Sequence, residues 1–304
     1  MSHLFGPVPS RRLGRSLGVD LVPPKTCTYD CLYCEVGPTT HLTKKRRAFE
    51  AAAIIRELQD YLRDSETTLD YLTITGSGEP TLNLDLKDIV ATIRDLTTTP
   101  VAILTNGSLL YLPEVRRDLA QSQVILPSLD AAREETYRAI NRPVPGLTLE
   151  KLVFGLKALR REFAGQIWLE VLLLKGLNDT EAELTGLRRL IREIAPDKVQ
   201  LNTAVRPVVE DAAQPLTTAE MAAVAAFLGE GVEVIAGFDR SPAARKSIND
   251  ADFLETLARR PMTARDLAQM MGLPLDQVEK RLARLQAAGL ITRDFYHQEG
   301  FYRG

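Results

Sequence analysis

The stretch PKTCTYDCLYCEVG, residues 24–37, holds all three cysteines of the 304-residue chain. Cys27, Cys31 and Cys34 follow the spacing Cys-x3-Cys-x2-Cys. Thiolates this close together can surround one soft metal centre, and both an iron–sulfur cluster and zinc are chemically reasonable. Structural zinc needs four protein ligands, and His41 is the one nearby candidate for the fourth. A cluster of [4Fe-4S] type on three thiolates instead leaves one iron open to a small molecule.

The overall composition is that of an ordinary globular protein. Apolar residues make up 45% of the chain, which is enough for one large domain and a small appendage. The 38 basic and 40 acidic residues give a net charge of −2. No global charge therefore points to nucleic acid or to an acidic membrane surface, and any such partner must be recognised locally.

The N-terminal residues lack the continuous apolar region of a secretory signal, because prolines and arginines interrupt them. No window approaches 18 uninterrupted apolar residues, so we expect no membrane-spanning helix and no membrane partner. We expect a cytoplasmic protein. Thiols stay reduced there, and clustered cysteines are more often metal ligands or catalysts than disulfides.

Short apolar runs alternate with longer amphipathic runs along most of the chain. The apolar runs have the length of buried parallel strands, and the amphipathic runs have the period of helices that connect such strands. The predicted strands are 16–22, 69–75, 101–106, 124–130, 166–174, 197–204 and 232–238. The predicted helices include 48–64, 86–96, 149–163 and 180–194.

This alternation predicts an α/β fold, a partial (β/α) TIM-like barrel over residues 1–240. The unusual residues follow strand ends. The cysteines come after 16–22, GSGEP occupies 76–80 after the next strand, and Asn106-Gly107 ends the strand after that. The carboxyl ends of strands carry the chemistry in parallel barrels, so we expect these residues to meet at one site.

The sequence period changes after Phe238. Residues 249–259, 263–272 and 274–289 predict three helices, and 290–303 predict a short two-stranded wing. This order is typical of a winged helix–turn–helix. We therefore predict a small C-terminal domain over residues 241–304, with the boundary between 238 and 248.

At this point the sequence resembles a known family. CTYDCLYC, residues 27–34, matches the three-cysteine signature of the radical S-adenosylmethionine (SAM) enzymes, with an aromatic residue before the last cysteine. GSGEP is similar to their glycine-rich SAM-binding segment. Residues 6–23 and 199–207 resemble a subgroup of iron–sulfur oxidoreductases that is similar to the wyosine-tRNA synthetases. The resemblance covers about residues 5–238.

The resemblance implies two cofactors, one [4Fe-4S] cluster and SAM. Cys27, Cys31 and Cys34 would hold three irons, while the amino and carboxylate groups of SAM chelate the fourth. Tyr33 would lie against the adenine. Four residues of the glycine-rich segment would present backbone carbonyls and a carboxylate to the SAM ammonium group: Gly76, Ser77, Gly78 and Glu79. Taken alone, GSGEP is equally a tight turn between a strand and a helix.

Later strand ends offer further SAM contacts by the same resemblance. The candidates for the ribose and carboxylate are Asn106, Ser128, Asp130 and Glu170, and those for the adenine pocket are Val199, Leu201 and Asn202. Each has a plainer alternative. Asn106-Gly107 can be a simple turn, and Asp130 and Glu170 can be helix caps or salt-bridge partners.

The resemblance also implies the reaction. Reductive cleavage of SAM would give a 5′-deoxyadenosyl radical that abstracts hydrogen from the substrate, with electrons from flavodoxin or ferredoxin. Because the chain has no other cysteine, it cannot ligate a second cluster through thiolates. The substrate and any catalytic residue beyond the cofactor sites are not readable. The C-terminal domain favours a macromolecule, such as tRNA or a protein, over a metabolite.

The predicted winged helix leaves its partner open. Its second half carries basic and aromatic residues that suit nucleic acid: Lys280, Arg281, Arg284, Arg293, Tyr296 and His297. Winged helices also bind proteins or serve as packing modules. RNA, DNA and protein therefore all stay open as partners, and a purely structural role stays open as well. The alternative function is a non-enzymatic regulator that contains zinc or an iron–sulfur cluster and binds DNA.

Three smaller features complete the sequence. The run KKRR, residues 44–47, and the pair Arg11-Arg12 suit phosphate contact, and for the run a solvated surface is the plainer alternative. We interpret NRP, residues 141–143, as a loop fixed near the site, without a physical account of it. Met270 and Met271 are expected to do no more than pack their helix.

Overall fold

A computed structural model gives the structure of the chain except at residues 1, 11, 65–66, 211, 236–249, 260 and 297–298. Its centre is an eight-stranded sheet in the order β1-β2-β5-β6-β7-β8-β9-β10. The strands are β1 (Leu4–Ser10), β2 (Gly14–Asp20), β5 (Tyr71–Thr75), β6 (Val101–Thr105), β7 (Val124–Pro127), β8 (Gln166–Leu173), β9 (Lys198–Thr203) and β10 (Val232–Val234). The strands follow one another in chain order, which is the layout of a barrel.

The strands from β2 to β10 are parallel, and β1 runs antiparallel to β2 at one edge. The two end strands, β1 and β10, are not paired with each other in the described part of the chain, so the barrel is partial. The central strands are apolar on both faces, and every residue of β7 is buried. Burial on both faces is what parallel strands covered by helices require.

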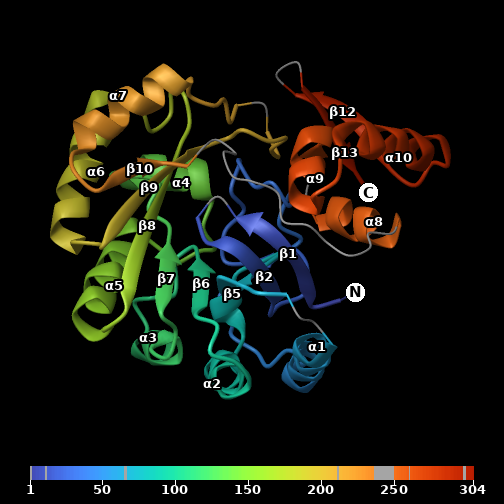
Figure 1. Ribbon diagram of the computed structural model, residues 1–304. Helices are drawn as coiled ribbons and strands as arrows, with labels where there is room; N and C mark the ends of the chain where they lie inside the picture. Colours follow the sequence, from blue (N-terminus) through green and yellow to red (C-terminus); the bar gives the residue numbers. More distant parts are fainter. Residues whose placement is uncertain are drawn as a thin grey trace.

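Helices cover the outside of the curved sheet (Figure 1). They are α1 (Ala51–Asp64), α2 (Leu86–Leu96), α3 (Pro113–Leu119), α4 (Glu134–Asn141), α5 (Leu149–Glu162), α6 (Glu181–Ile194) and α7 (Thr218–Leu228). A single 3-10 turn, η1 (Pro80–Leu82), follows the glycine-rich segment. Threonine hydroxyls of Thr148, Thr180 and Thr217 accept backbone N–H groups at the starts of α5, α6 and α7, which explains where these helices begin.

All seven predicted strands and all four predicted helices are present, so the fold prediction is confirmed. Residues 236–238 of the last predicted strand, 232–238, lie outside the described residues. The sequence did not predict β1, whose Pro7 and Pro9 argue against a strand. Proline is tolerated there because β1 lies at the sheet edge, where one side of its backbone needs no partner. The short helices α3 and α4, and α7, were not predicted either.

The C-terminal residues fold as the predicted winged helix. The elements are α8 (Asp250–Arg259), β11 (Met262–Thr263), α9 (Ala264–Met271), α10 (Leu275–Ala287), β12 (Thr292–Tyr296) and β13 (Glu299–Arg303). The three strands pair in the order β11-β13-β12. The module has its own apolar core, which includes Phe253, Leu267, Val278 and Leu282, and Val8 of β1 packs against that core.

The winged helix lies beside β1 and β2 (Figure 1), and α9 contacts β1 directly. The predicted boundary at residues 240 and 241 lies outside the described residues, so the division at that point stays a prediction. Among the helices that the structure describes, none is both long and apolar enough to cross a membrane.

Candidate metal and cofactor site

A cavity of about 430 Å³ runs from the carboxyl ends of the central strands into the barrel. Cys27, Cys31 and Cys34 line it together with nearly all the predicted cofactor residues. Those in its wall are Tyr33, Gly76, Ser77, Gly78, Glu79, Asn106, Ser128, Glu170 and Asn202. Asp130 is not part of the wall, and Val199 and Leu201 belong to the hydrophobic core. The fold thus brings together two motifs whose nearest residues, Cys34 and Gly76, are 42 positions apart in the sequence.

The glycine-rich segment is bonded directly to the cysteine loop. The backbone N–H of Lys25 donates to the Ser77 carbonyl at 2.7 Å, and that of Glu79 donates to the Thr26 carbonyl at 3.0 Å. A Cβ on Gly78 would come within 2.0 Å of the Thr26 oxygen, so only glycine allows this approach. The two motifs therefore form one rigid unit just before Cys27.

A second segment supports the other side of the cysteine loop. The backbone N–H of Leu32 donates to the Ile140 carbonyl at 3.0 Å, and that of Val144 donates to the Thr28 carbonyl at 2.9 Å. Tyr29 and Pro143 form an antiparallel bridge between these contacts. The NRP motif thus lies against the cysteine loop, which confirms that it fixes a loop near the site.

Burial raises the pKa of all three thiols. It brings the pKa of Cys27 to about 12, and Glu79 and the Cys34 thiol add to the increase at that sulfur. The pKa values of Cys31 and Cys34 also rise, chiefly through burial. Reactive catalytic cysteines show the opposite shift. A positively charged metal centre would reverse it, because metal ligands bind as thiolates.

The three cysteines fit a cluster better than a single ion. No three His, Cys, Asp or Glu side chains converge on one point in the described ranges. A [4Fe-4S] cluster does not need that convergence, because each thiolate binds a different iron. His41, the candidate fourth ligand for zinc, lies exposed on β4 (His41–Leu42), which pairs with β3 (Thr26–Cys27). This geometry offers no four-ligand zinc site.

Glu79 joins three parts of the site. Its carboxylate accepts hydrogen bonds from the backbone and hydroxyl of Thr81, from the Thr105 hydroxyl at 2.6 Å, and from the Asn106 backbone N–H at 2.8 Å. Its side chain is 2% exposed. Burial raises its pKa, and these hydrogen bonds act in the opposite direction. In this structure Glu79 fixes the loop after β6.

Asn106 lies between Glu79 and the cysteine loop. Its Nδ2 donates to the Thr28 hydroxyl at 2.7 Å and lies 3.6 Å from the Cys27 sulfur. The position is therefore more than a simple turn: it places an amide N–H against one thiol at the cavity wall.

Asp130 does not line the cavity but accepts a hydrogen bond from Tyr33, which does. The Tyr33 hydroxyl donates to Oδ2 of Asp130, and the Leu172 backbone N–H donates to Oδ1 at 3.0 Å. Asp130 is 2% exposed, and burial raises its pKa. This arrangement gives Asp130 a supporting role for Tyr33, where the sequence suggested contact with SAM.

The inner end of the cavity carries an ion pair that the sequence did not reveal. Arg12, in the turn between β1 and β2, pairs with Glu170, and Nδ2 of Asn202 donates to Glu170 at 3.1 Å. Glu170 was placed at a strand end, but it lies in the middle of β8. Of the roles that the sequence suggested for Glu170, the structure shows the salt bridge. The sequence suggested phosphate contact for Arg12, and its ion pair with Glu170 was not predicted because the turn that carries it was not predicted.

The winged helix supplies part of the cavity wall. Thr256 of α8 and Met270 of α9 line the same space as the cysteines. Met270 is 5% exposed and also packs in the module's own core, so the expectation that it does nothing but pack its helix is wrong. Nearby, the Tyr296 hydroxyl donates to the Ala213 carbonyl at 3.4 Å. No sequence signal separates Met270 from Met271.

The basic residues of the winged helix are engaged within the protein. Arg284 and Arg281 both pair with Asp250, the first at 2.5 Å. Arg293 stacks on Phe295 and Tyr302. His297 lies outside the described residues. Arg46 of the KKRR run is likewise engaged, with Asp118 and with the Thr81 carbonyl.

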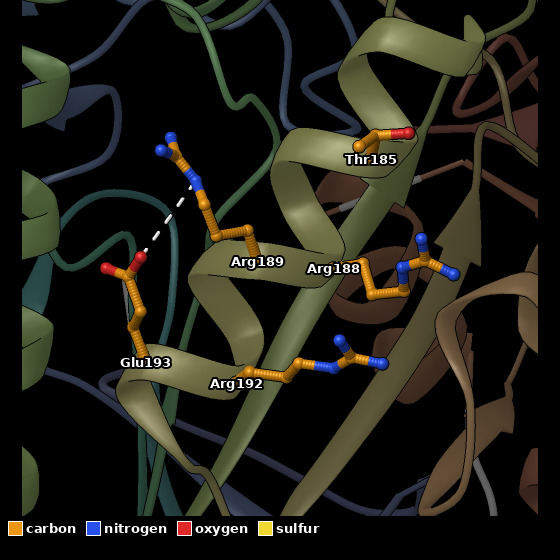
Figure 2. Close-up of a pocket in the computed structure, with 5 residues that line it drawn as sticks. All are labelled: Thr185, Arg188, Arg189, Arg192 and Glu193. Carbon is orange, nitrogen blue, oxygen red and sulfur yellow. Dashed lines mark ion pairs between the residues drawn. The ribbon is translucent and has the colours of Figure 1, made fainter.

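A second, shallower hollow lies on α6, away from the cysteines. Figure 2 shows Arg188 and Arg192 extending from the same side of the helix, while Arg189 turns toward Glu193. Arg188 stacks on the Phe227 ring at 4.3 Å. No motif of the sequence falls here, and we assign it no part in the chemistry.

Comparison with known protein families agrees with both parts of the chain. The radical SAM superfamily matches residues 21–186, and the MarR family matches residues 247–295. A UPF0026 protein of Helicobacter pylori is 33% identical over 267 residues, which are 86% of each chain. A protein of Brachyspira hyodysenteriae named GTPase Obg is 38% identical over 297 residues. That match includes 96% of this chain but only 44% of the length of the relative.

Solved structures show the same fold. The structure of TYW1 with a lysine–pyruvate adduct bound superposes with a TM-score of 0.55 and 17% identity, over 74% of this chain and 75% of that one. The cysteine loop, the glycine-rich segment and the parallel strands β5 to β8 all lie within the superfamily match. The chain therefore belongs to the radical SAM superfamily of enzymes and carries a MarR-type winged helix at its C-terminal end.

Proposed function

We propose that the chain is a radical SAM enzyme with a single [4Fe-4S] cluster held by Cys27, Cys31 and Cys34. One observation carries the proposal: the three cysteines and the glycine-rich segment line the same cavity and are joined by backbone hydrogen bonds. When bound, the cluster supplies the electron that cleaves SAM to a 5′-deoxyadenosyl radical, which abstracts hydrogen from the substrate.

The residues of the chain prepare this cavity. Gly76 and Gly78 let the backbone approach the SAM ammonium group, and Glu79 holds Asn106 beside Cys27. Tyr33 is kept in the wall by Asp130, where its ring can lie against the adenine. At the inner end, Glu170 and Asn202 offer polar contacts for the ribose. A recessed space of this kind, once SAM and the substrate fill it, would limit the access of water to a reactive intermediate.

We propose that the electrons come from a low-potential donor of the flavodoxin or ferredoxin class, since nothing in the sequence suggests a second cluster to relay them. A cytoplasmic location would keep the three thiols reduced before the cluster is assembled. We do not propose GTPase activity, although the Brachyspira relative is named a GTPase, because this sequence contains no Gly-x4-Gly-Lys-Ser/Thr phosphate loop.

The substrate is proposed to be a macromolecule, RNA or protein, presented with the help of the winged helix. The support is structural, because Thr256 and Met270 place that module in the cavity wall, beside the reacting groups. The MarR match favours nucleic acid as the partner. The pairing of Arg281 and Arg284 with Asp250 means that these side chains must leave that carboxylate before they contact phosphate.

Anaerobic reconstitution tests the proposal. The protein is loaded with iron and sulfide, its absorption near 400 nm is recorded, and 5′-deoxyadenosine is measured by mass spectrometry after dithionite and SAM are added. We expect a cluster and deoxyadenosine from the wild type and from His41→Ala, and neither from Cys31→Ala. A colourless protein that holds one zinc, and that loses it in His41→Ala, would instead establish the regulator alternative.

A further inference from the structure

Asn141 is a buried polar residue that the proposed chemistry does not yet use. It is the last residue of α4 and the first of the NRP motif, and it is 2% exposed. Its Nδ2 lies 3.6 Å from the Cys31 sulfur, 2.9 Å from Oδ2 of Asp130 and 3.2 Å from the Tyr33 hydroxyl. The side chain therefore reaches the cysteine loop independently of the backbone bonds that its segment makes.

The hydrogen-bond geometry assigns the two amide hydrogens. An asparagine amide donates two N–H groups. Asp130 is the nearest acceptor and takes one of them. The second is shared between two acceptors, the Tyr33 oxygen at 3.2 Å and the Cys31 sulfur at 3.6 Å. Asp130 thus orients the amide so that its second N–H reaches both the tyrosine oxygen and the sulfur.

An N–H directed at a cysteine ligand affects the redox state of a cluster. Reduction adds negative charge, which spreads onto the sulfurs, and a hydrogen-bond donor stabilises that charge. The reduced state is then easier to reach. Asn106 points an amide at Cys27 in the same way, so two of the three cysteines receive a side-chain N–H.

We propose that Asn141 is a positioning residue that raises the reduction potential of the cluster through its N–H···S contact with Cys31. The inference rests on the proposed function, because it requires the cluster to be present. It explains why an amide is buried at this point of the NRP motif, beyond the backbone support that the segment gives to the cysteine loop.

The test is a reduction potential measured by EPR in a dithionite titration of the reconstituted protein without SAM. Asn141→Leu keeps the size of the side chain but removes both N–H groups, and Asn141→Ser is too short to reach the sulfur. The matched control is Arg142→Lys, in the same motif, because it keeps the positive charge near Cys31 and changes only the side chain that pairs with Glu210. We expect both Asn141 variants to lower the equilibrium constant for reduction roughly tenfold, a shift of about 59 mV for one electron.

Each outcome decides the matter. A lower potential in the Asn141 variants, with Arg142→Lys unchanged, supports the inference. It is overturned by unchanged potentials in the Asn141 variants, by an equal shift in Arg142→Lys, or by loss of the cluster in both Asn141 variants, which would show anchoring alone. If the wild type itself assembles no cluster, the proposed function fails first, and the absorption spectrum shows this before any titration.

Discussion

Two buried glutamates show how similar chemistry is put to different use at different places. Glu79 and Glu183 are both almost fully buried, and each accepts several hydrogen bonds from neighbouring backbone and hydroxyl groups. Glu183 lies in the first turn of α6 and holds the segment that begins at Ala132. Glu79 lies in the cavity wall and holds Asn106. Both glutamates are therefore buried, and they differ in that only Glu79 lies in the wall of the cavity.

This contrast gives a prediction for Glu79→Gln. An amide can accept at one end alone, so the Asn106 N–H loses its acceptor, which costs about 1–3 kcal/mol of unfolding free energy. Because Asn106 then moves at the cavity wall, SAM affinity measured by calorimetry should also fall. Glu183→Gln should cost similar stability in urea denaturation and leave SAM affinity unchanged. Equal SAM affinity in both variants would mean that Glu79 has no bearing on the cofactor site.

At the scale of elements, the sequence predicts strands and helices whose patterns repeat. It does not predict features that depend on tertiary contacts. The buried strands and amphipathic helices were predictable because their patterns repeat. The cysteines and GSGEP were predictable because parallel strands end at one edge. The β1–β2 turn was not predictable, since an edge strand with two prolines resembles a loop, and so the ion pair between Arg12 and Glu170 was not predicted. The supporting role of Asp130 depends on tertiary contacts that no local pattern encodes.

The N-terminus of α7 carries a pH prediction. Thr217 and Glu220 form a reciprocal cap, and Lys175, which follows β8, pairs with Glu220 at 2.7 Å. The lysine pairing, followed by the cap, lowers the pKa of Glu220 to about 2. A carboxyl with a lowered pKa stabilises the folded state above its ordinary value of 4.5, and that stability is lost as the pH falls toward 2.

Glu220→Gln should therefore be less stable than the wild type in urea denaturation at pH 7. The difference should shrink steadily as the pH is lowered from 4.5 toward 2, because the wild type loses the charge that the variant never had. A difference that stays constant over this range would show that the cap depends on shape and not on charge. Thr92→Ser, on the exposed face of α2, serves as a control without a titrating group.

At the scale of the whole molecule, the winged helix is part of the cavity as well as an appended module. It packs on β1 through Val8, and α8 and α9 each contribute one residue to the wall. The helix that would contact DNA in a winged helix, α10, has no residue in that wall. A partner bound on α10 could thus be held by the same module that closes the cavity.

Neighbouring methionines on α9 test that arrangement. Met270 and Met271 are both buried in the core of the winged helix, but Met270 alone lines the cavity. Truncation of either to alanine should cost about 2–5 kcal/mol of stability, because each leaves a cavity in the core. Met270→Ala should also weaken SAM binding up to roughly tenfold, since each lost buried methylene is worth about 0.8 kcal/mol of apolar contact. Met271→Ala should leave SAM affinity as it is. If the two variants bound SAM equally well, the winged helix would be no part of the cofactor site, and its function would have to be sought on its outer face.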